Sequence, residues 1–210
     1  MAPLIIKVCG MTEAENIRSV EQLGIDMIGF IFYPKSPRYL YEMPEYLPTR
    51  AKRTGVFVNE SKENIMIYAD RFALDYIQLH GNESPEYCRS LRNNGMRLIK
   101  AFSISQPKDL TGISAYKGLC DYYLFDTKTS QYGGSGNQFD WNLLYRYSGT
   151  TPFLLSGGIN PYSTKAIKEF HHSKLAGIDI NSRFETVPGK KDTERIKKFL
   201  QEIRNGETAY

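Results

Sequence analysis

Eight short apolar runs recur along the chain at regular spacing. Their C-terminal ends are separated by 21 to 30 residues, which is the length of one strand, one helix and two short loops. Because nearly every position in them is apolar, the runs are typical of strands that are covered on both faces. The runs are Leu4–Cys9, Met27–Phe32, Thr54–Asn59, Tyr76–His80, Arg97–Ala101, Tyr122–Asp126, Pro152–Ser156 and Ala176–Asp179.

The segments between these runs carry helix signals. A capping-box pattern begins at Thr12, and Ser61 precedes a stretch with apolar residues at helical spacing. Ser84 is followed by proline, which is favoured at the first position of a helix. Pro161 and Asp192 mark the starts of two further segments with an apolar stripe. We therefore expect helices between the strands.

Strands that alternate with helices predict an α/β protein with a parallel sheet. Eight such units predict a single closed (β/α)8 barrel, the TIM-barrel fold. The 210 residues are near the lower limit for that fold, so we expect one domain over residues 1–210. An open doubly wound sheet is the alternative, but it usually begins with a glycine-rich turn, whereas the first turn here reads Cys9-Gly10-Met11-Thr12.

Composition excludes several classes of partner. The 27 basic and 23 acidic residues give a net charge of +4, too small and too scattered to predict nucleic-acid binding. The longest apolar stretch, Met27–Tyr33, is much shorter than the roughly 20 residues that span a bilayer. Lys7 interrupts the first apolar run, so the N-terminus does not resemble a signal peptide. Three cysteines without metal-ligand spacing predict a reducing, cytoplasmic location and no metal site.

Polar side chains stand where the predicted strands end, which is where active sites of barrels of this kind gather. These candidates are Cys9, His80, Asp126, Ser156 and Asp179. Strand alternation also places Lys7 on the same face as Cys9.

Three glycine-bearing or polar segments follow the last three predicted strands. Each alone is equally typical of an ordinary turn, but barrels frequently bind phosphate with loops in this half. Together they predict a phosphate site, whereas no Walker A pattern or GxGxxG supports a nucleotide. The predicted phosphate-binding residues are Gly134, Ser135, Gly136, Ser156, Gly157, Gly158, Asn181 and Ser182.

Several segments of the chain together match one known family, in the family's order. They are 7–12, 29–32 with 36–38, 55–59, 77–81, 124–127 with 133–136 and 139–141, 155–159 and 177–182. The Cys-Gly-Met-Thr opening and the block Phe-Asp-Thr…Gly-Gly-Ser-Gly are the most specific parts. On these segments the chain resembles phosphoribosylanthranilate isomerase from residue 5 to about residue 192.

The resemblance implies an isomerase of tryptophan biosynthesis. The family converts N-(5-phosphoribosyl)anthranilate, an aminoaldose, into 1-(2-carboxyphenylamino)-1-deoxyribulose 5-phosphate, an aminoketose, by an Amadori rearrangement. This reaction needs an acid to open the furanose ring and a base to remove the proton from the second sugar carbon. It needs no cofactor or metal. We expect a small sugar-phosphate substrate and a monomer or homodimer.

The resemblance also implies the catalytic pair. Asp126 resembles the general acid, although a solvated aspartate that caps the next loop is the alternative. Cys9 resembles the general base, and Lys7 is the nearby cation that could stabilise its thiolate. The alternative for Cys9 is a small buried apolar residue.

Four residues are expected to bind the substrate. Lys7 is one of them, and the alternative for Lys7 is a lysine that extends out of the barrel to solvent. Arg38 resembles the residue that holds the anthranilate carboxylate, since a guanidinium suits a carboxylate through two parallel hydrogen bonds. Asp179 resembles a residue that binds a ribulose hydroxyl. His80 stands at a strand end, where a structural role is almost equally expected.

The chain departs from the family pattern near the predicted phosphate site. Asn181 and Arg183 stand where serine and glycine are usual, and Ser156 stands where alanine is common. The isomerase of histidine biosynthesis performs the same rearrangement, but it has an aspartate where Cys9 stands. A barrel that only binds a phosphorylated ligand is the alternative outside enzymes.

Overall fold

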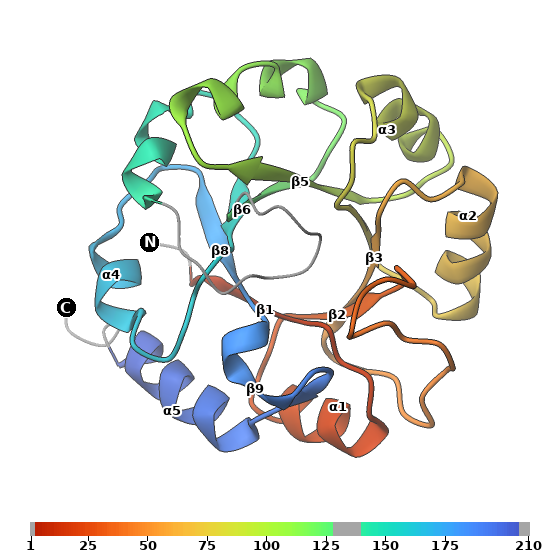
Figure 1. The fold of residues 1–210 in the computed structure, drawn as a ribbon, viewed down its shortest axis with the longest axis vertical. Coiled ribbons are helices and arrows are strands. Elements are labelled where there is room, and N and C mark those ends of the chain that lie inside the picture. Colours follow the sequence, from red (N-terminus) through yellow and green to blue (C-terminus); the bar gives the residue numbers. More distant parts are fainter. Residues whose placement is uncertain (1–2, 128–139, 206–210) are drawn as a thin grey trace.

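Eight parallel strands close into a barrel, which confirms the predicted fold class. The computed structural model describes residues 3–127 and 140–205, and Figure 1 looks down on the ring of strands with the helices outside it. The ring closes where β1 pairs with β8, with Lys7 beside Asp179. The strands are β1 (Ile5–Cys9), β2 (Met27–Ile31), β3 (Lys52–Phe57), β4 (Tyr76–Leu79), β5 (Leu98–Ile104), β6 (Tyr122–Thr127), β7 (Phe153–Leu155) and β8 (Leu175–Ile180).

The connections differ in how much helix they contain. The α-helices are α1 (Ala14–Glu21), α2 (Lys62–Arg71), α3 (Pro85–Arg92), α4 (Thr164–Glu169) and α5 (Thr193–Arg204). Short 3-10 helices are η1 (Pro107–Leu110), η2 (Ile113–Tyr116), η3 (Trp141–Arg146) and η4 (Ser182–Phe184). The connection from β2 to β3 has no helix, because four prolines interrupt it between residues 34 and 48.

The helix starts follow the sequence signals in three of five cases. The side chains of Ser61, Ser84 and Asp192 accept hydrogen bonds from backbone N–H groups of the first turn, as predicted. The capping box at Thr12 was wrong, because its hydroxyl donates to the carbonyl of Gly189 instead. Helix α4 begins three residues after Pro161, at Thr164.

The barrel interior changes from apolar to polar along the strands. An apolar cluster fills it around Met27, Tyr76, Ile99, Leu124 and Leu154. Further along the strands the interior positions hold Lys7, Gln78 and Asp179, all buried. A second and larger apolar core packs the helices against the outside of the barrel. The polar side chains of the interior thus lie toward the C-terminal ends of the strands, which is where barrels of this kind have their active sites.

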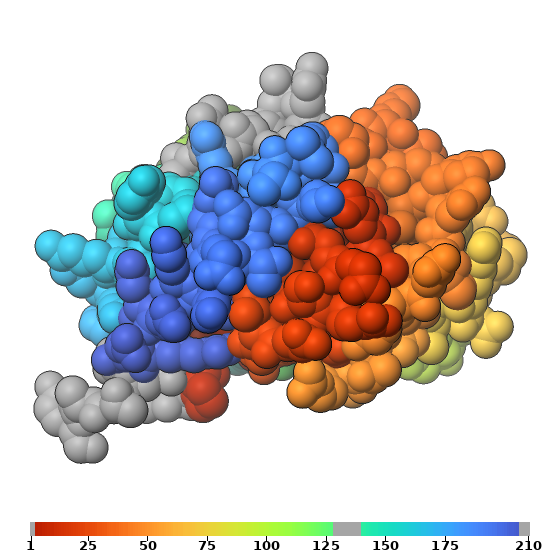
Figure 2. All heavy atoms as spheres, turned by 90° about the horizontal axis from the view of Figure 1, so that it is seen from below, coloured from red at the N-terminus to blue at the C-terminus, as the bar shows by residue number. Residues whose placement is uncertain are grey.

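A small hairpin between β8 and α5 contacts the N-terminal helix α1. It consists of β9 (Glu185–Val187) and β10 (Lys190–Lys191), and it is tied to α1 by Asn16. The Asn16 side chain donates to the carbonyl of Lys191 at 2.8 Å and accepts from its N–H at 2.7 Å. Figure 2 shows the C-terminal segments (blue) lying directly against the N-terminal ones (red).

Candidate active site

A buried ion pair lies at the centre of the polar end. Lys7 Nζ is 2.7 Å from Asp179 Oδ1, and the Ser156 hydroxyl donates to Asp179 Oδ2 at 3.1 Å. Burial lowers the pKa of Lys7, but the negative charges of Asp179 and Cys9 outweigh it, so the pKa is raised above 10.5. Lys7 therefore points into the barrel as an ammonium ion and does not extend to solvent.

Cys9 ends β1 beside this pair and is almost completely buried. Its neighbour across the sheet is Gly29, and a Cβ there would lie 2.7 Å from the Cys9 sulfur. Burial raises the pKa of the Cys9 thiol above its ordinary value of 9.0, while the Lys7 and Lys191 ammonium groups oppose the rise. Lys7 thus favours the thiolate as expected, but burial has the larger effect.

Asp126 and His80 form a second pair on neighbouring parts of the rim. His80 Nε2 is 3.3 Å from Asp126 Oδ2, and both side chains are about one-fifth exposed. The amide nitrogen of Gln78 lies 2.8 Å from His80 Nδ1. Gln78 and Asp126 thus contact the two ring nitrogens of His80 from opposite ends. The backbone N–H of Thr127 donates to the other oxygen of Asp126 at 2.8 Å.

Gly157 makes room for Asp126. Its φ is +77°, which favours glycine, and a Cβ there would lie 2.9 Å from Asp126 Oδ1. Gly158 follows with a φ of +71°. This double-glycine turn brings the backbone after β7 close to Asp126 and Thr127 at the end of β6, an approach for which a residue with a Cβ would leave no room.

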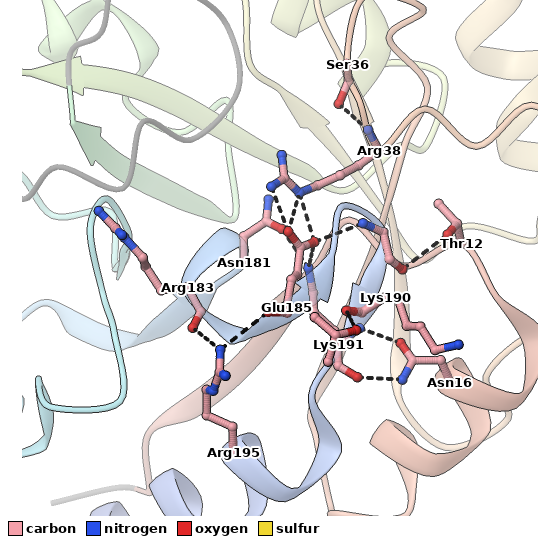
Figure 3. Close-up of polar contacts among 12 residues, drawn as sticks. Thr12, Asn16, Ser36, Arg38, Asn181, Arg183, Glu185, Lys190, Lys191 and Arg195 are labelled. Atoms are coloured by element: carbon pink, nitrogen blue, oxygen red, sulfur yellow. Dashed lines mark hydrogen bonds and ion pairs between the residues drawn. The ribbon is translucent and has the colours of Figure 1, made fainter.

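Arg38 reaches the rim from the connection after β2, and its side chain is buried. Its guanidinium makes a forked contact with Glu185, with Nε 2.9 and 3.0 Å from the two carboxylate oxygens and Nη2 2.7 Å from Oε2 (Figure 3). A Cβ at Gly10, whose φ is +74°, would lie 2.6 Å from Arg38 Cδ. Glycine at position 10 is therefore needed for this path of the arginine side chain.

Two residues around the Arg38 guanidinium, Glu185 and Lys191, were not indicated by any sequence pattern. Lys191 Nζ contacts Glu185 Oε1 at 2.5 Å and Asn181 Oδ1 at 2.7 Å, and the Lys191 side chain is fully buried. Glu185 and Lys191 belong to none of the strand-end or glycine motifs. The only hint is that both follow β8 within a dozen residues of Asp179.

The predicted phosphate-binding residues fall into three groups. Those after β7 and β8 lie on neighbouring strands of the barrel. The side chains of Ser156 and Asn181 are already hydrogen-bonded, to Asp179 and Lys191 respectively, while Ser182 opens η4. Gly134, Ser135 and Gly136 lie outside the described residues.

Two general properties follow from the described part of the chain. Residues 3–127 and 140–205 contain no cluster of three His, Cys, Asp or Glu side chains placed to hold a metal ion. No helix within the same ranges is long and apolar enough to cross a membrane.

Comparison with known proteins identifies the family. A family model described as N-(5'phosphoribosyl)anthranilate (PRA) isomerase matches residues 6–202. The chain belongs to the PRA isomerase family. A PRA isomerase from Phocaeicola vulgatus is 54% identical over 201 residues, covering 96% of this chain and 98% of the relative.

Solved structures of the family have the same barrel. A PRA isomerase from Thermotoga maritima aligns with a TM-score of 0.84 and 38% identity, covering 97% of this chain and 100% of that chain. A second, at TM-score 0.82 and 32% identity with the same coverage, is in complex with reduced 1-(o-carboxyphenylamino)-1-deoxyribulose 5-phosphate. The family resemblance expected from the sequence is thus confirmed.

Proposed function

We propose that this protein converts N-(5-phosphoribosyl)anthranilate into 1-(2-carboxyphenylamino)-1-deoxyribulose 5-phosphate in tryptophan biosynthesis. Two observations together support the proposal. The chain belongs to the PRA isomerase family, and residues able to act as acid or base, among them Asp126 and His80, lie at one end of the barrel. Cys9 and Asp126 stand at the ends of β1 and β6, on the rim where barrel enzymes carry their chemistry.

Asp126 would donate a proton to the furanose ring oxygen, which opens the ring and leaves a Schiff base. Cys9 would then remove the proton from the second sugar carbon, and the resulting enamine rearranges to the ketone. His80 and the Thr127 N–H hold the Asp126 carboxyl from two sides. Lys7 favours the Cys9 thiolate that the second step requires.

The remaining residues would bind the two ends of the substrate. Arg38 would hold the anthranilate carboxylate through parallel hydrogen bonds. Asp179, oriented by Lys7, would accept a hydrogen bond from a ribulose hydroxyl. His80, which contacts Asp126, would also bind the substrate. The backbone of the glycine turn at 157–158, with Ser156, Asn181, Ser182 and the segment 134–136, would bind the phosphate.

We also propose that residues 1–210 act as one catalytic domain, that the protein is cytoplasmic and that it is a monomer or homodimer. Sedimentation of the purified protein measures the oligomeric state. A form larger than a dimer would contradict this part.

The activity test uses the fluorescence of the substrate, generated in place from anthranilate because it is unstable. Adding the wild-type protein should abolish the emission. Asp126→Asn should abolish turnover but still bind the reduced product analogue, because the amide keeps the shape and loses the acid. Asp70→Asn, the same substitution on the exposed face of α2, is the matched control. No loss of emission with micromolar wild-type protein would overturn the function, and near-normal turnover by Asp126→Asn would overturn the role of Asp126.

A further inference from the structure

Glu185 occupies one edge of the Arg38 guanidinium and leaves its other edge without a described partner. A guanidinium carries five N–H donors, and Glu185 uses the one on Nε and one on Nη2. Within the described residues no acceptor contacts Nη1. The edge formed by Nη1 and Nη2 therefore has the geometry to take a second carboxylate side by side.

Lys191 changes the charge of this group. An isolated Arg38–Glu185 pair would be neutral, and a second carboxylate approaching it would be repelled by Glu185. Lys191 adds a second cation on the opposite side of Glu185, and its side chain is fully buried. Burial lowers the pKa of Lys191, and the Glu185 carboxylate beside it limits the fall. With Lys191 protonated, the two cations and one anion have a net charge of +1, which attracts an incoming anion.

The backbone holds Glu185 rigidly in this position. Gly189 N–H donates to its Oε1 at 3.1 Å, and the hairpin that carries it is fixed to α1 by Asn16 (Figure 3). The two cations keep the pKa of Glu185 below its ordinary value despite burial. The carboxylate therefore stays ionised, and a long, flexible arginine side chain is restricted to one orientation.

We propose that Glu185 and Lys191 are positioning residues that present Arg38 to the carboxylate of the substrate. Glu185 fixes the guanidinium so that its outer edge faces the rim, and Lys191 offsets the charge of Glu185 so that the group still attracts an anion. This inference rests on the role of Arg38 given under the proposed function.

The experiment compares two ligands, of which only one carries the carboxylate. The first is the reduced product analogue, and the second is ribulose 5-phosphate, which lacks the whole carboxyphenylamino group. Glu185→Gln should weaken binding of the analogue by about tenfold or more, because Arg38 loses its fixed orientation. Binding of ribulose 5-phosphate should be unchanged. In turnover, KM should rise while kcat changes little.

Charge alone predicts the opposite result. Glu185→Gln removes a negative charge next to Arg38, so if Glu185 merely competed with the substrate, the analogue would bind more tightly. Tighter or unchanged binding of the analogue would therefore overturn the proposal. Lys191→Met should weaken binding of the analogue but not binding of ribulose 5-phosphate. Equal weakening of binding for both ligands would contradict the proposed role of Lys191.

Controls separate this inference from the proposed function. Glu13→Gln removes an exposed ion pair with Lys190 on the same hairpin and should leave both affinities unchanged. Far-UV circular dichroism shows whether each variant is folded. Glu185→Gln keeps the shape of the side chain but replaces one of its two acceptor oxygens by an NH2 group, so it breaks the forked contact with Arg38. It therefore tests the proposal even if Lys191→Met does not fold. A wild-type protein that neither turns over nor binds the analogue refutes the proposed function. An active wild type with an unaffected Glu185→Gln variant refutes only the inference.

Discussion

Lys100 and Glu83 form a buried ion pair that links β5 to the segments that follow β3 and β4. Lys100 Nζ is 3.1 Å from Glu83 Oε2, and each side chain is only 3% exposed. Glu83 also accepts from the N–H groups of Asn59 and Gly81, after β3 and β4. Lys100 contacts the carbonyl of Gly81 at 2.8 Å, immediately after His80. We predict that Lys100→Met is among the most destabilising substitutions at this end of the barrel.

The magnitude follows from what the substitution leaves behind. Methionine fills most of the volume but cannot donate, so Glu83 remains as a buried charge without its cation. Breaking a buried pair in this way costs about 3–5 kcal/mol. For a chain of this size that lowers the melting temperature by roughly 6–20 °C. Glu83→Gln should cost less, because Lys100 keeps carbonyl oxygens as acceptors.

Urea unfolding followed by circular dichroism measures these free energies. In the double variant Lys100→Met/Glu83→Gln the loss should be smaller than the sum of the single losses by about 1 kcal/mol or more. The control is Lys52→Met. Lys52 Nζ lies 2.9 Å from Asp75 Oδ1, closer than in the Lys100–Glu83 pair, but this ion pair is largely exposed. Its loss should lower the free energy of unfolding by less than about 1 kcal/mol. A loss of that small size for Lys100→Met, or strictly additive losses, would refute the reasoning.

Three further outcomes are expected. Gly29→Ala should lower kcat by about 10- to 100-fold with little change in circular dichroism, since the new methyl group would displace the Cys9 sulfur; an unchanged kcat would contradict the proposed base. Because burial raises the pKa of Cys9 above 9.0, the rate of Cys9 alkylation by iodoacetamide should keep rising with pH from pH 7 through pH 9, and a plateau below pH 9 would disprove the raised value. Burial alone would raise the pKa of Glu21, but hydrogen bonds from Tyr46 and from three backbone N–H groups lower it below 4.5. The ionised Glu21 therefore stabilises the folded state fully above pH 4.5, and this stabilisation is lost as the pH falls through the folded-state pKa. In acid, the free energy of unfolding should depend less steeply on pH in Glu21→Gln than in the wild type. Equal pH dependence of the free energy of unfolding in the two proteins would refute this.

Local sequence patterns predicted the strands well because each strand is buried on both faces. An apolar run such as Ile5–Cys9 or Met27–Ile31 needs no knowledge of its neighbours to be identified. The starts of the helices in the connections were harder to predict, since a side chain that could cap its own helix can instead bond to a group far away in the sequence. Thr12 shows this, because its hydroxyl bonds to a carbonyl 177 residues away in place of its own helix.

The sequence by itself determined the barrel and the residues at the strand ends, because parallel strands bring their C-terminal ends to one rim. Only the tertiary structure decided how those residues are paired. The partners of Lys7 and Arg38 lie 172 and 147 residues away, and contacts over such distances have no local signal. The balance of charges also depends on burial, which is why Cys9 has a raised pKa despite the lysine two residues before it.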